Sequence, residues 1–465
     1  MIAKEGIMTS KMNKYSMVPE LVEQVSTKHR RIVTKLPVPE SLSYFKMMED
    51  YEPNSMLGQP PVVVDKAEGC YIYDKYGNKW LDWASGVLIS NIGNGNKAIV
   101  DALKKMLDKP LLSTYVFPHE GRTQLAKLLC EIFPFKGYRV YFLSTGSEAI
   151  ENCIKLAKTY GLRKYGKDKK YFISFKNSFH GRTMGAQLAG GMEKSKAWLG
   201  DLDETFIQIP FPDGYKCEDT SFDLFLNTLK SQGIEPEQVC GVMSESFQGV
   251  GPDFFPMEYI KKLEKWCKSN DVLLIMDEVQ AGFCRSGKWF MFEHYGIQPD
   301  LVACGKGISS SLPLSAVIGR KDIMNIYAPG SMTSTHSGSP LPVAAAIANI
   351  LEMKRGNYLN NTRRLEPILR EGLEKIQNKH PAQAGCIHCL GLVAGIQIVK
   401  SGTKTPDSET ALAINQQCFR KGLLMFAPVG IAGECIKIAP ALDIPEDALL
   451  EGLEVLDSSM DEVLS

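Results

Sequence analysis

Three segments of the sequence place residue types that suit chemistry directly after short apolar runs. The first, Ser144–Glu148, follows a run that begins at Val140 and leads into an amphipathic stretch. A glycine and a serine at the start of a helix present unpaired amides and the positive end of the helix dipole, which suit a phosphate group. The simpler interpretation of this segment is an ordinary helix N-cap by serine or threonine.

A carboxylate and a lysine follow two later apolar runs. Asp277 comes after Leu273–Met276, where an unpaired buried charge would cost several kcal/mol, so it needs an arginine or a protonated ring nitrogen as partner. Lys306 comes after Leu301–Cys304 and lies between two glycines. A desolvated lysine in a tight turn suits a Schiff-base amine with a lowered pKa, although such a turn can also be exposed.

Together the three segments match the needs of one cofactor. Pyridoxal phosphate requires an anchor for its phosphate, a carboxylate that keeps its pyridine nitrogen protonated, and an amine that holds its aldehyde as an imine. The sequence offers these groups in that order along the chain. The combination therefore predicts pyridoxal 5'-phosphate, which no single segment does.

These groups can meet only if the apolar runs are strands whose ends share one edge of a sheet. Seven runs, too short for helices and apolar on both faces, are typical of buried strands joined by helical crossovers. Only about nine residues separate the last two runs, too few for a parallel crossover, so that pair is expected to be antiparallel. The prediction is an α/β fold with a mixed, mostly parallel seven-stranded sheet and helices on both faces, with strands at Val140–Ser144, Tyr171–Phe175, Thr205–Ile209, Val239–Ser244, Val272–Met276, Leu301–Cys304 and Leu314–Ile318.

The two ends of the chain show a different pattern. Residues 1–75 are charged and interrupted by prolines, with a strand pair expected at Val62–Val64 and Gly69–Tyr73. Residues 341–465 alternate helix-like and strand-like segments. We expect residues 1–75 and 341–465 to form a smaller α+β domain and residues 76–340 to form the large cofactor-binding domain.

Composition excludes several classes of protein. The 465 residues carry 53 Lys and Arg against 53 Asp and Glu, so nothing indicates a nucleic acid or an anionic membrane as partner. The apolar stretches are far shorter than the roughly 18 residues of a transmembrane span, and Met1–Met17 does not resemble a secretory signal. Twelve cysteines, mostly in apolar segments, fit a cytoplasmic protein. The C-x-x-C pair Cys386 and Cys389 lacks a second ligand pair, so no metal site is expected.

A family resemblance is carried by four segments, Ser144–Ala149, Ser178–Thr183, Asp277–Gly287 and Gly305–Gly319. In order and spacing they resemble the class III aminotransferases, the group of 4-aminobutyrate, ornithine and other ω-amino acid aminotransferases, and the resemblance runs from about Gly69 to the C-terminus. It implies the fold type I architecture of pyridoxal phosphate enzymes. It also implies transfer of an amino group from an ω-amino acid or related amine to a 2-oxo acid, in a homodimer or higher even oligomer.

The resemblance implies a role for each matched residue. Lys306 would form the Schiff base and move the proton, and Asp277 would pair with the pyridine nitrogen. The other positions implied at the cofactor are Gly146 and Ser147 at the phosphate, Phe179 above the ring, Val279 below it, Gln280 at the ring hydroxyl, His180 and Glu245 in support, and Thr335, which would reach the phosphate of a neighbouring subunit.

Three residues are implied at the substrate, namely Val87, Arg182 and Lys437. Arg182 matches the arginine with which the 4-aminobutyrate branch holds the carboxylate distal to the amine; the alternative is a salt bridge within the protein. Val250 stands where the family has a glutamate, and Lys437 stands where it has the arginine that this glutamate masks. The usual charge switch between ω-amino and α-amino substrates is therefore missing or rebuilt.

Two other functions are compatible with parts of the pattern. Some members of the same group racemise or epimerise amino acids on the same lysine, and the segment Leu312–Ala316 fits that branch as well. A non-catalytic protein of the same fold is the third alternative, and the presence of Lys306, Asp277 and Gln280 argues against it.

Overall fold

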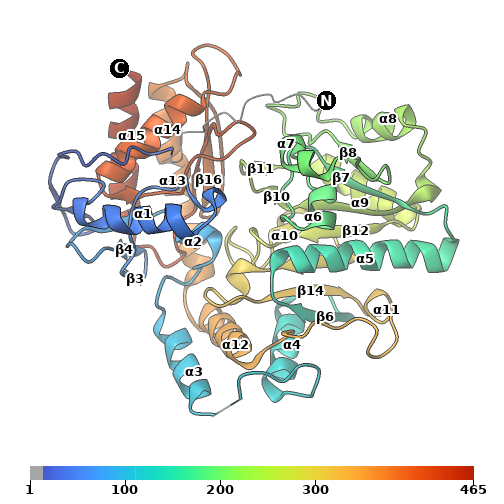
Figure 1. Ribbon diagram of the computed structural model, residues 1–465. Coiled ribbons are helices and arrows are strands. Elements are labelled where there is room, and N and C mark those ends of the chain that lie inside the picture. Colours follow the sequence, from blue (N-terminus) through green and yellow to red (C-terminus); the bar gives the residue numbers. More distant parts are fainter. Residues whose placement is uncertain (1–13, 110) are drawn as a thin grey trace, which may run out of the picture.

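The computed structural model describes residues 14–109 and 111–465 (Figure 1). Its largest sheet has seven strands. In spatial order they are β6 (Tyr138–Leu143), β14 (Ser315–Arg320), β13 (Leu301–Cys304), β12 (Leu273–Asp277), β9 (Val239–Glu245), β7 (Tyr171–Phe175) and β8 (Phe206–Ile209). From β13 to β8 all neighbours are parallel, whereas β14 is antiparallel to both β13 and β6. The predicted mixed sheet is confirmed, and so is the antiparallel pairing of the last two predicted strands, β13 and β14.

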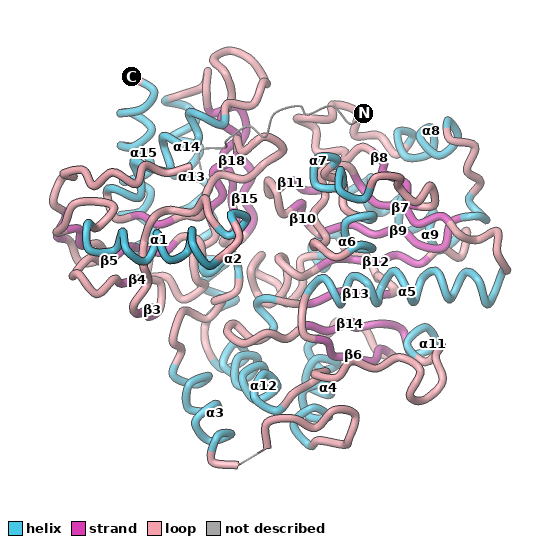
Figure 2. The backbone as a smooth tube through the Cα atoms, viewed as in Figure 1, coloured by secondary structure: helices cyan, strands magenta, loops and turns pink. Residues whose placement is uncertain are grey.

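Helices cover both faces of this sheet (Figure 2). On one face α5 (Gly146–Tyr165) buries Ile150 and Cys153 against Ile275 of β12. On the other face α9 (Met257–Ser269) packs against β12, and α4 (Glu120–Ile132) packs against β6. The other helices in this part of the chain are α2 (Ser85–Leu88), α3 (Lys97–Leu107), α6 (Met184–Ala189), α7 (Glu193–Lys196), α8 (Asp223–Ser231), α10 (Phe292–Tyr295), α11 (Lys321–Met324) and α12 (Pro340–Arg355).

Strands from the two ends of the chain share one sheet. β17 (Leu423–Leu424) pairs in parallel with β5 (Lys79–Asp82), which lies beside β4 (Tyr71–Tyr73). The remaining strands of this sheet are β1 (Val25–Ser26), β2 (Arg31–Ile32) and β3 (Lys66–Glu68). The prediction of a strand at Val62–Val64 is wrong. The segment that pairs with β4 in the hairpin is Lys66–Glu68 instead. The division of the chain into a large and a small domain at residues 75 and 340 stays a prediction.

A second small sheet lies near the C-terminus. Its strands are β15 (Ala384–Leu390), β16 (Val393–Ile398) and β18 (Cys435–Ile438), all antiparallel. A short hairpin of β10 (Phe247–Gln248) and β11 (Asp253–Phe254) lies beside it (Figure 2). The helices of the two ends are α1 (Leu42–Tyr51), α13 (Tyr358–Lys379), α14 (Ser408–Arg420) and α15 (Glu446–Leu464).

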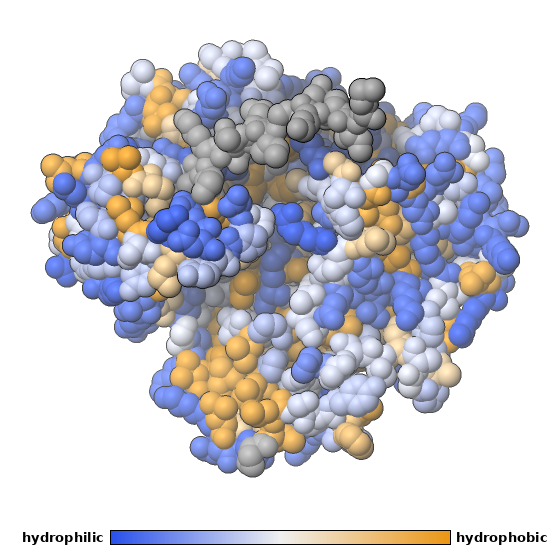
Figure 3. Space-filling view, in the orientation of Figure 1, coloured by the Kyte–Doolittle hydropathy of each residue, from blue (hydrophilic) through white to orange (hydrophobic). Residues whose placement is uncertain are grey.

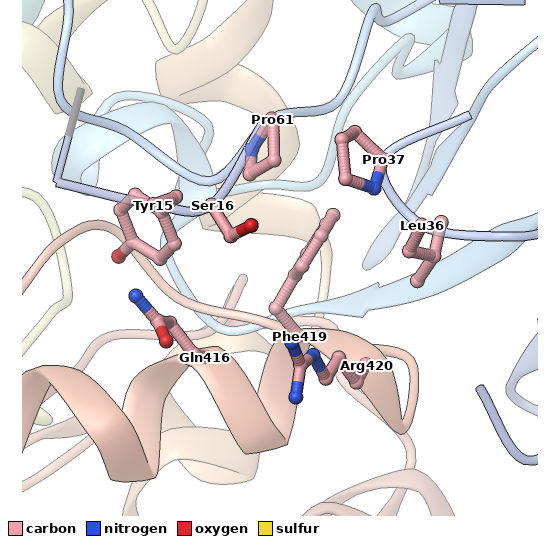
Figure 4. Close-up of a pocket in the computed structure, with 8 residues that line it drawn as sticks. All are labelled: Tyr15, Ser16, Leu36, Pro37, Pro61, Gln416, Phe419 and Arg420. Carbon is pink, nitrogen blue, oxygen red and sulfur yellow. The ribbon is translucent and has the colours of Figure 1, made fainter. Parts of the chain in front are cut away.

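The N-terminal residues that the structure describes pack against α14 (Figure 4). The Tyr15 hydroxyl donates a hydrogen bond to Asn415 Oδ1 at 2.7 Å, and Leu36 and Phe419 line a cavity of only about 20 Å³. Such a volume holds about one water molecule, so this cavity is no candidate for a substrate site. Within the described residues, no helix has the length and apolarity needed to cross a bilayer.

Candidate active site

A cavity of about 320 Å³ lies at the edge of the large sheet where its parallel strands end. Residues at or just after the carboxyl ends of β6, β7, β9, β12 and β13 line it, because these five strands run in the same direction and end at the same edge. The cavity brings together all three chemical segments of the sequence. Its lining consists of Thr145, Gly146, Ser147, Phe179, His180, Gly181, Arg182, Glu245, Asp277, Val279, Gln280 and Lys306.

The first turn of α5 forms one wall of this cavity. Thr145 and Glu148 make a capping box, in which Thr145 Oγ1 accepts from the Glu148 amide at 3.3 Å. The amides of Gly146 and Ser147 have no acceptor within the helix, as is general for a first turn. A Cβ on Gly146 would lie 2.8 Å from Val279 Cγ1, so glycine is required for this close approach. The result is a pair of free amides at the positive end of a long helix.

A buried imidazole–carboxylate pair forms the floor of the cavity. His180 Nδ1 lies 2.8 Å from Asp277 Oδ2, and the Val279 amide donates to Asp277 Oδ1 at 2.9 Å. Both side chains are buried, and His180 Nε2 has no partner among the described residues. The sequence analysis expected an arginine or a ring nitrogen beside Asp277. It gave His180 a supporting role at the cofactor but did not foresee its contact with Asp277, because no motif spacing connects the two residues.

Glu245 holds two backbone segments at the cavity. Its carboxylate accepts from the amides of Phe179 at 2.9 Å and Gly249 at 2.8 Å. Burial, together with the charge of Asp277, raises the pKa of Glu245 to about 7, although His180 and these two hydrogen bonds oppose the shift. Glu245 thus orients the turn that carries Phe179.

Lys306 occupies a constrained turn at the end of β13. Its φ is +42°, a left-handed conformation that costs a non-glycine residue about 1–2 kcal/mol. The buried Asn349 of α12 holds the turn by donating to the carbonyls of Gly307 at 2.8 Å and Ile308 at 2.9 Å. Burial lowers the pKa of Lys306, and the charges of Asp277 and Glu245 oppose this effect.

Lys437 lies behind the cavity rather than in its lining. Its Nζ donates to the carbonyl of Gly249 at 2.6 Å and to Gln280 Oε1 at 2.8 Å. Burial, followed by repulsion from Lys306, lowers the pKa of Lys437 to about 7. Val250 is buried nearby and offers no charge. Lys437 is therefore paired with neutral oxygens.

Arg182 reaches the cavity from its exposed side. Its guanidinium carbon lies 5.7 Å from the centre of the Phe179 ring, and it forms no ion pair with any residue that the structure describes. A salt bridge within this chain, the alternative considered for Arg182, is therefore absent from the described part. The guanidinium remains available for an anionic group.

Two of the predicted site residues lie away from this lining. Val87 is 44% exposed and has a φ of +62°, in the left-handed stretch that makes up α2. Thr335 is exposed and lines a separate cavity together with Glu148 and Glu151. The structure of one chain does not bring Val87 or Thr335 to Lys306.

Sequence reasoning also missed two buried polar residues that support the site. Asn349 lies within an otherwise apolar helix stretch, and that isolated amide is the signal that could have identified it. Glu278 accepts hydrogen bonds from the Ser246 hydroxyl and from the amides of Met291 and Phe292, the latter two at 2.9 Å. Burial raises the pKa of Glu278 to about 7 against these hydrogen bonds.

The donor set of the cavity fits pyridoxal phosphate. Free amides at a helix N-terminus suit the phosphate, a buried carboxylate suits a protonated ring nitrogen, and a lysine suits the aldehyde. Gly146 and Gly305 keep the space beside Val279 free of side-chain atoms, since a Cβ on Gly305 would lie 3.0 Å from Val279 Cγ1. Sheet, helices and site together define a fold type I pyridoxal phosphate enzyme.

Comparison with known proteins gives the family. Residues 54–460 match the family described as "Aminotransferase class-III". The chain is 33% identical over 407 residues to acetylornithine aminotransferase of Caldanaerobacter subterraneus, covering 87% of this chain and 95% of that one. It is 31% identical to 4-aminobutyrate aminotransferase of Mycobacterium leprae, covering 92% and 97% of the two chains. The chain belongs to the class III aminotransferase family, whose members depend on pyridoxal phosphate.

Two further similarities bear on fold and function. A solved aminotransferase of Bacillus anthracis superposes with a TM-score of 0.82 at 26% identity, covering 91% of this chain and 99% of that one. The alanine/serine racemase of Pyrococcus horikoshii is 28% identical, covering 97% of both chains. The relatives of this chain therefore include proteins named for both reaction types.

Proposed function

We propose that this protein transfers an amino group from an ω-amino acid to a 2-oxo acid. The observation that carries the proposal is a single cavity lined by Lys306, the buried His180–Asp277 pair and the free guanidinium of Arg182. When bound, pyridoxal phosphate supplies an aldehyde that holds the substrate amine and a ring that draws electrons from the adjacent carbon.

Several residues of the cavity would hold and orient the cofactor. The amides of Gly146 and Ser147 would hold the phosphate at the start of α5. Asp277 would face the ring nitrogen in a fixed orientation, because His180 and the Val279 amide each contact one of its oxygens. Phe179 and Val279 would confine the ring from its two faces.

Lys306 would move the proton. It is the one lysine among the described residues that line the cavity. Because burial lowers the pKa of its Nζ, a larger fraction of the amine is neutral and able to take a proton from the substrate carbon. Its constrained turn keeps the amine directed at one point.

Arg182 would select the substrate. Two relatives are named for 4-aminobutyrate and acetylornithine, molecules whose reacting amine lies far from a carboxylate. A guanidinium at the cavity entrance can pair with such a distal carboxylate through two hydrogen bonds. Lys437 is engaged by Gln280 and Gly249. We therefore assign Lys437 to positioning Gln280 rather than to binding an α-carboxylate.

A homodimer would complete the site. Thr335 is exposed on one chain, and a second copy would bring it to the phosphate position of its neighbour. Exposed apolar side chains lie at the end of α3 and in the segment that leads to α4, namely Leu107, Leu112 and Phe117, with 59%, 60% and 73% of their surface accessible. Figure 3 shows an apolar surface in this lower part of the molecule, where α3 and α12 lie. An apolar face of this kind is typical of a subunit interface.

The substrate proposal is tested with two amines of equal chain length. 5-Aminopentanoate carries a distal carboxylate and pentylamine does not, and pyruvate and 2-oxoglutarate serve as acceptors. In Arg182→Ala the KM for 5-aminopentanoate should rise roughly 10- to 100-fold, as expected for the loss of hydrogen bonds to a charged group. The KM for pentylamine should change little. Arg139→Ala, which removes an exposed arginine from β6, is the matched control.

The same measurements distinguish amino-group transfer from the alternative activity, racemisation. Equal losses for both amines in Arg182→Ala would contradict the proposed carboxylate contact. Loss of chirality in α-amino acids without any 2-oxo acid, together with no transfer from ω-amino acids, would establish a racemase instead.

A further inference from the structure

A second cluster of reactive side chains lies outside the cofactor cavity. Cys386 Sγ is 3.5 Å from His388 Nε2, and His388 Nδ1 is 3.1 Å from Asp253 Oδ1. Cys386 and His388 are two residues apart on β15, so they share one face of the strand. Asp253 reaches His388 from β11. None of the three lines the cofactor cavity, and the proposed transfer uses none of them.

The carboxylate fixes the orientation of the imidazole. Asp253 is 1% exposed, and its second oxygen lies 2.7 Å from Lys216 Nζ. Hydrogen bonding to His388 and the charge of Lys216 outweigh burial and lower the pKa of Asp253, so this carboxylate stays ionised. Because Nδ1 of His388 donates a hydrogen bond to the Asp253 carboxylate, Nε2 faces the thiol.

The imidazole is poised to carry a charge beside the thiol. Burial lowers the pKa of His388, but its hydrogen bonds to Asp253 and Cys386 outweigh that effect and raise the pKa to about 10. A cationic imidazole favours the thiolate form of a neighbouring cysteine, which is the nucleophilic form. The other ionisable groups around this pair are Lys216, Tyr215 and Cys435.

The remaining cysteines lack this environment. All twelve are free and lie in the described residues, and nine of them are buried. The other two half-buried thiols, Cys130 and Cys217, face the backbone carbonyls of Tyr138 at 3.6 Å and Asp219 at 3.5 Å. Burial raises the pKa of both thiols. Cys389 lies on the opposite face of β15 and is buried.

Two buried polar atoms next to Cys386 are also without partners. Gln397 pairs directly with Cys386 across the strands, is 2% exposed, and its Oε1 accepts no hydrogen bond from the described residues. The Tyr215 hydroxyl, near Gly385, is likewise unpartnered among them. A polar ligand held at Cys386 would satisfy groups of this kind.

We propose that Cys386 is a nucleophilic thiol site that takes a small polar disulfide. The Cys386 thiolate attacks one sulfur of the reagent, a new bond forms from Sγ to that sulfur, and the reagent's own S–S bond breaks. The other half leaves as a thiolate and takes up a proton. Cys386 is thereby oxidised to a mixed disulfide, and the released half is reduced to a thiol.

The test uses the full-length holoenzyme and dithiobis(nitrobenzoate), a disulfide whose released half is coloured. At about pH 6 an ordinary thiol is almost fully protonated and reacts slowly. Cys386 should be labelled first at this pH, at least about tenfold faster than Cys130 and Cys217, as read by peptide mass mapping of the unmutated protein. Mapping needs no variant, so the result does not depend on whether a mutant folds.

Variants then assign the role of the histidine. Cys386→Ser should remove the fast release phase, and Cys130→Ser should retain it. His388→Gln should slow labelling of Cys386 at about pH 6 by about tenfold or more, with the rate recovering above about pH 9, where an ordinary thiol ionises unaided. First labelling at another cysteine, or an unchanged pH profile in His388→Gln, would overturn the proposal.

Discussion

The contact between His180 and Asp277 explains how a carboxylate can remain buried in the cavity. An isolated buried carboxylate would be destabilising, but Asp277 accepts from the Val279 amide and pairs with His180 at 2.8 Å. Both partners fix the orientation of the carboxylate. Asp277 is thus prepared to face a cationic ring nitrogen.

Asp277→Ala should lower kcat by at least on the order of 1,000-fold, because a preorganised charge that stabilises the developing negative charge is lost. Asp277→Asn should be little better, since it has the shape but not the charge. His180→Gln keeps the carboxylate and should cost less than either. Steady-state kinetics on the three variants measure this ranking, and near-native activity in Asp277→Ala would leave Asp277 with a structural role only.

Residue types and chain order were sufficient to predict Lys306, Asp277 and the Gly146–Ser147 turn as neighbours. The hydrogen bonds of His180 and Lys437 were not predictable, because both depend on side chains that meet across distant segments. Lys437 illustrates the limit. The family resemblance placed Lys437 at the substrate, and only the structure shows its hydrogen bonds to Gln280 and Gly249.

At the scale of elements, α5 packs closely against the turn after β12 at the proposed phosphate site. This approach depends on a glycine, since a Cβ on Gly146 would lie 2.8 Å from Val279 Cγ1. Any larger residue at position 146 must therefore shift either α5 or Val279.

Gly146→Ala should weaken pyridoxal phosphate binding by about tenfold or more while the protein stays folded, because a displaced helix start misdirects its free amides. Fluorescence titration of the cofactor-free protein measures the affinity. The double variant Gly146→Ala with Val279→Ala should recover most of it, because the opposing methyl groups are gone. Failure of this rescue would show that the packing of α5 on Val279 does not set the affinity.

The seven strands were predictable because each contains a short, mostly apolar run, and the connection length distinguished antiparallel β14 from the parallel strands. The edge strand β3 was missed for the opposite reason. Lys66–Glu68 is polar and largely exposed, so no hydrophobic signal marks it, whereas the apolar Val62–Val64 has no backbone partner in a sheet. Pairing with β4, not hydrophobicity, selects the strand there.

At the scale of the whole molecule, buried carboxyl groups link stability to pH. Burial raises the pKa of Glu278 to about 7, and the folded protein therefore binds its proton more tightly than the unfolded chain does. Stability from this group is complete below the unfolded pKa of 4.5 and is lost as the pH rises through about 7. The effect amounts to about 3 kcal/mol over that window.

The melting temperature of the cofactor-free protein should thus fall as the pH rises from about 5 to about 7.5, and it should fall less in Glu278→Gln. Glu245 titrates in the same window and keeps part of the slope in that variant. The exposed Glu258→Gln serves as control and should behave like the unmutated protein. An identical pH slope in all three proteins would contradict the linkage to Glu278.

The most direct test of amino-group transfer is a single half-reaction of the holoenzyme with 4-aminobutyrate or 5-aminopentanoate and no 2-oxo acid. We predict that the visible absorbance of the bound cofactor disappears as the amine form accumulates, and that an added 2-oxo acid restores it. Lys306→Ala, which keeps the anchor at α5, should show no such change. Persistence of the absorbance with every ω-amino acid tried, while a chiral α-amino acid loses its optical activity, would contradict the proposed function.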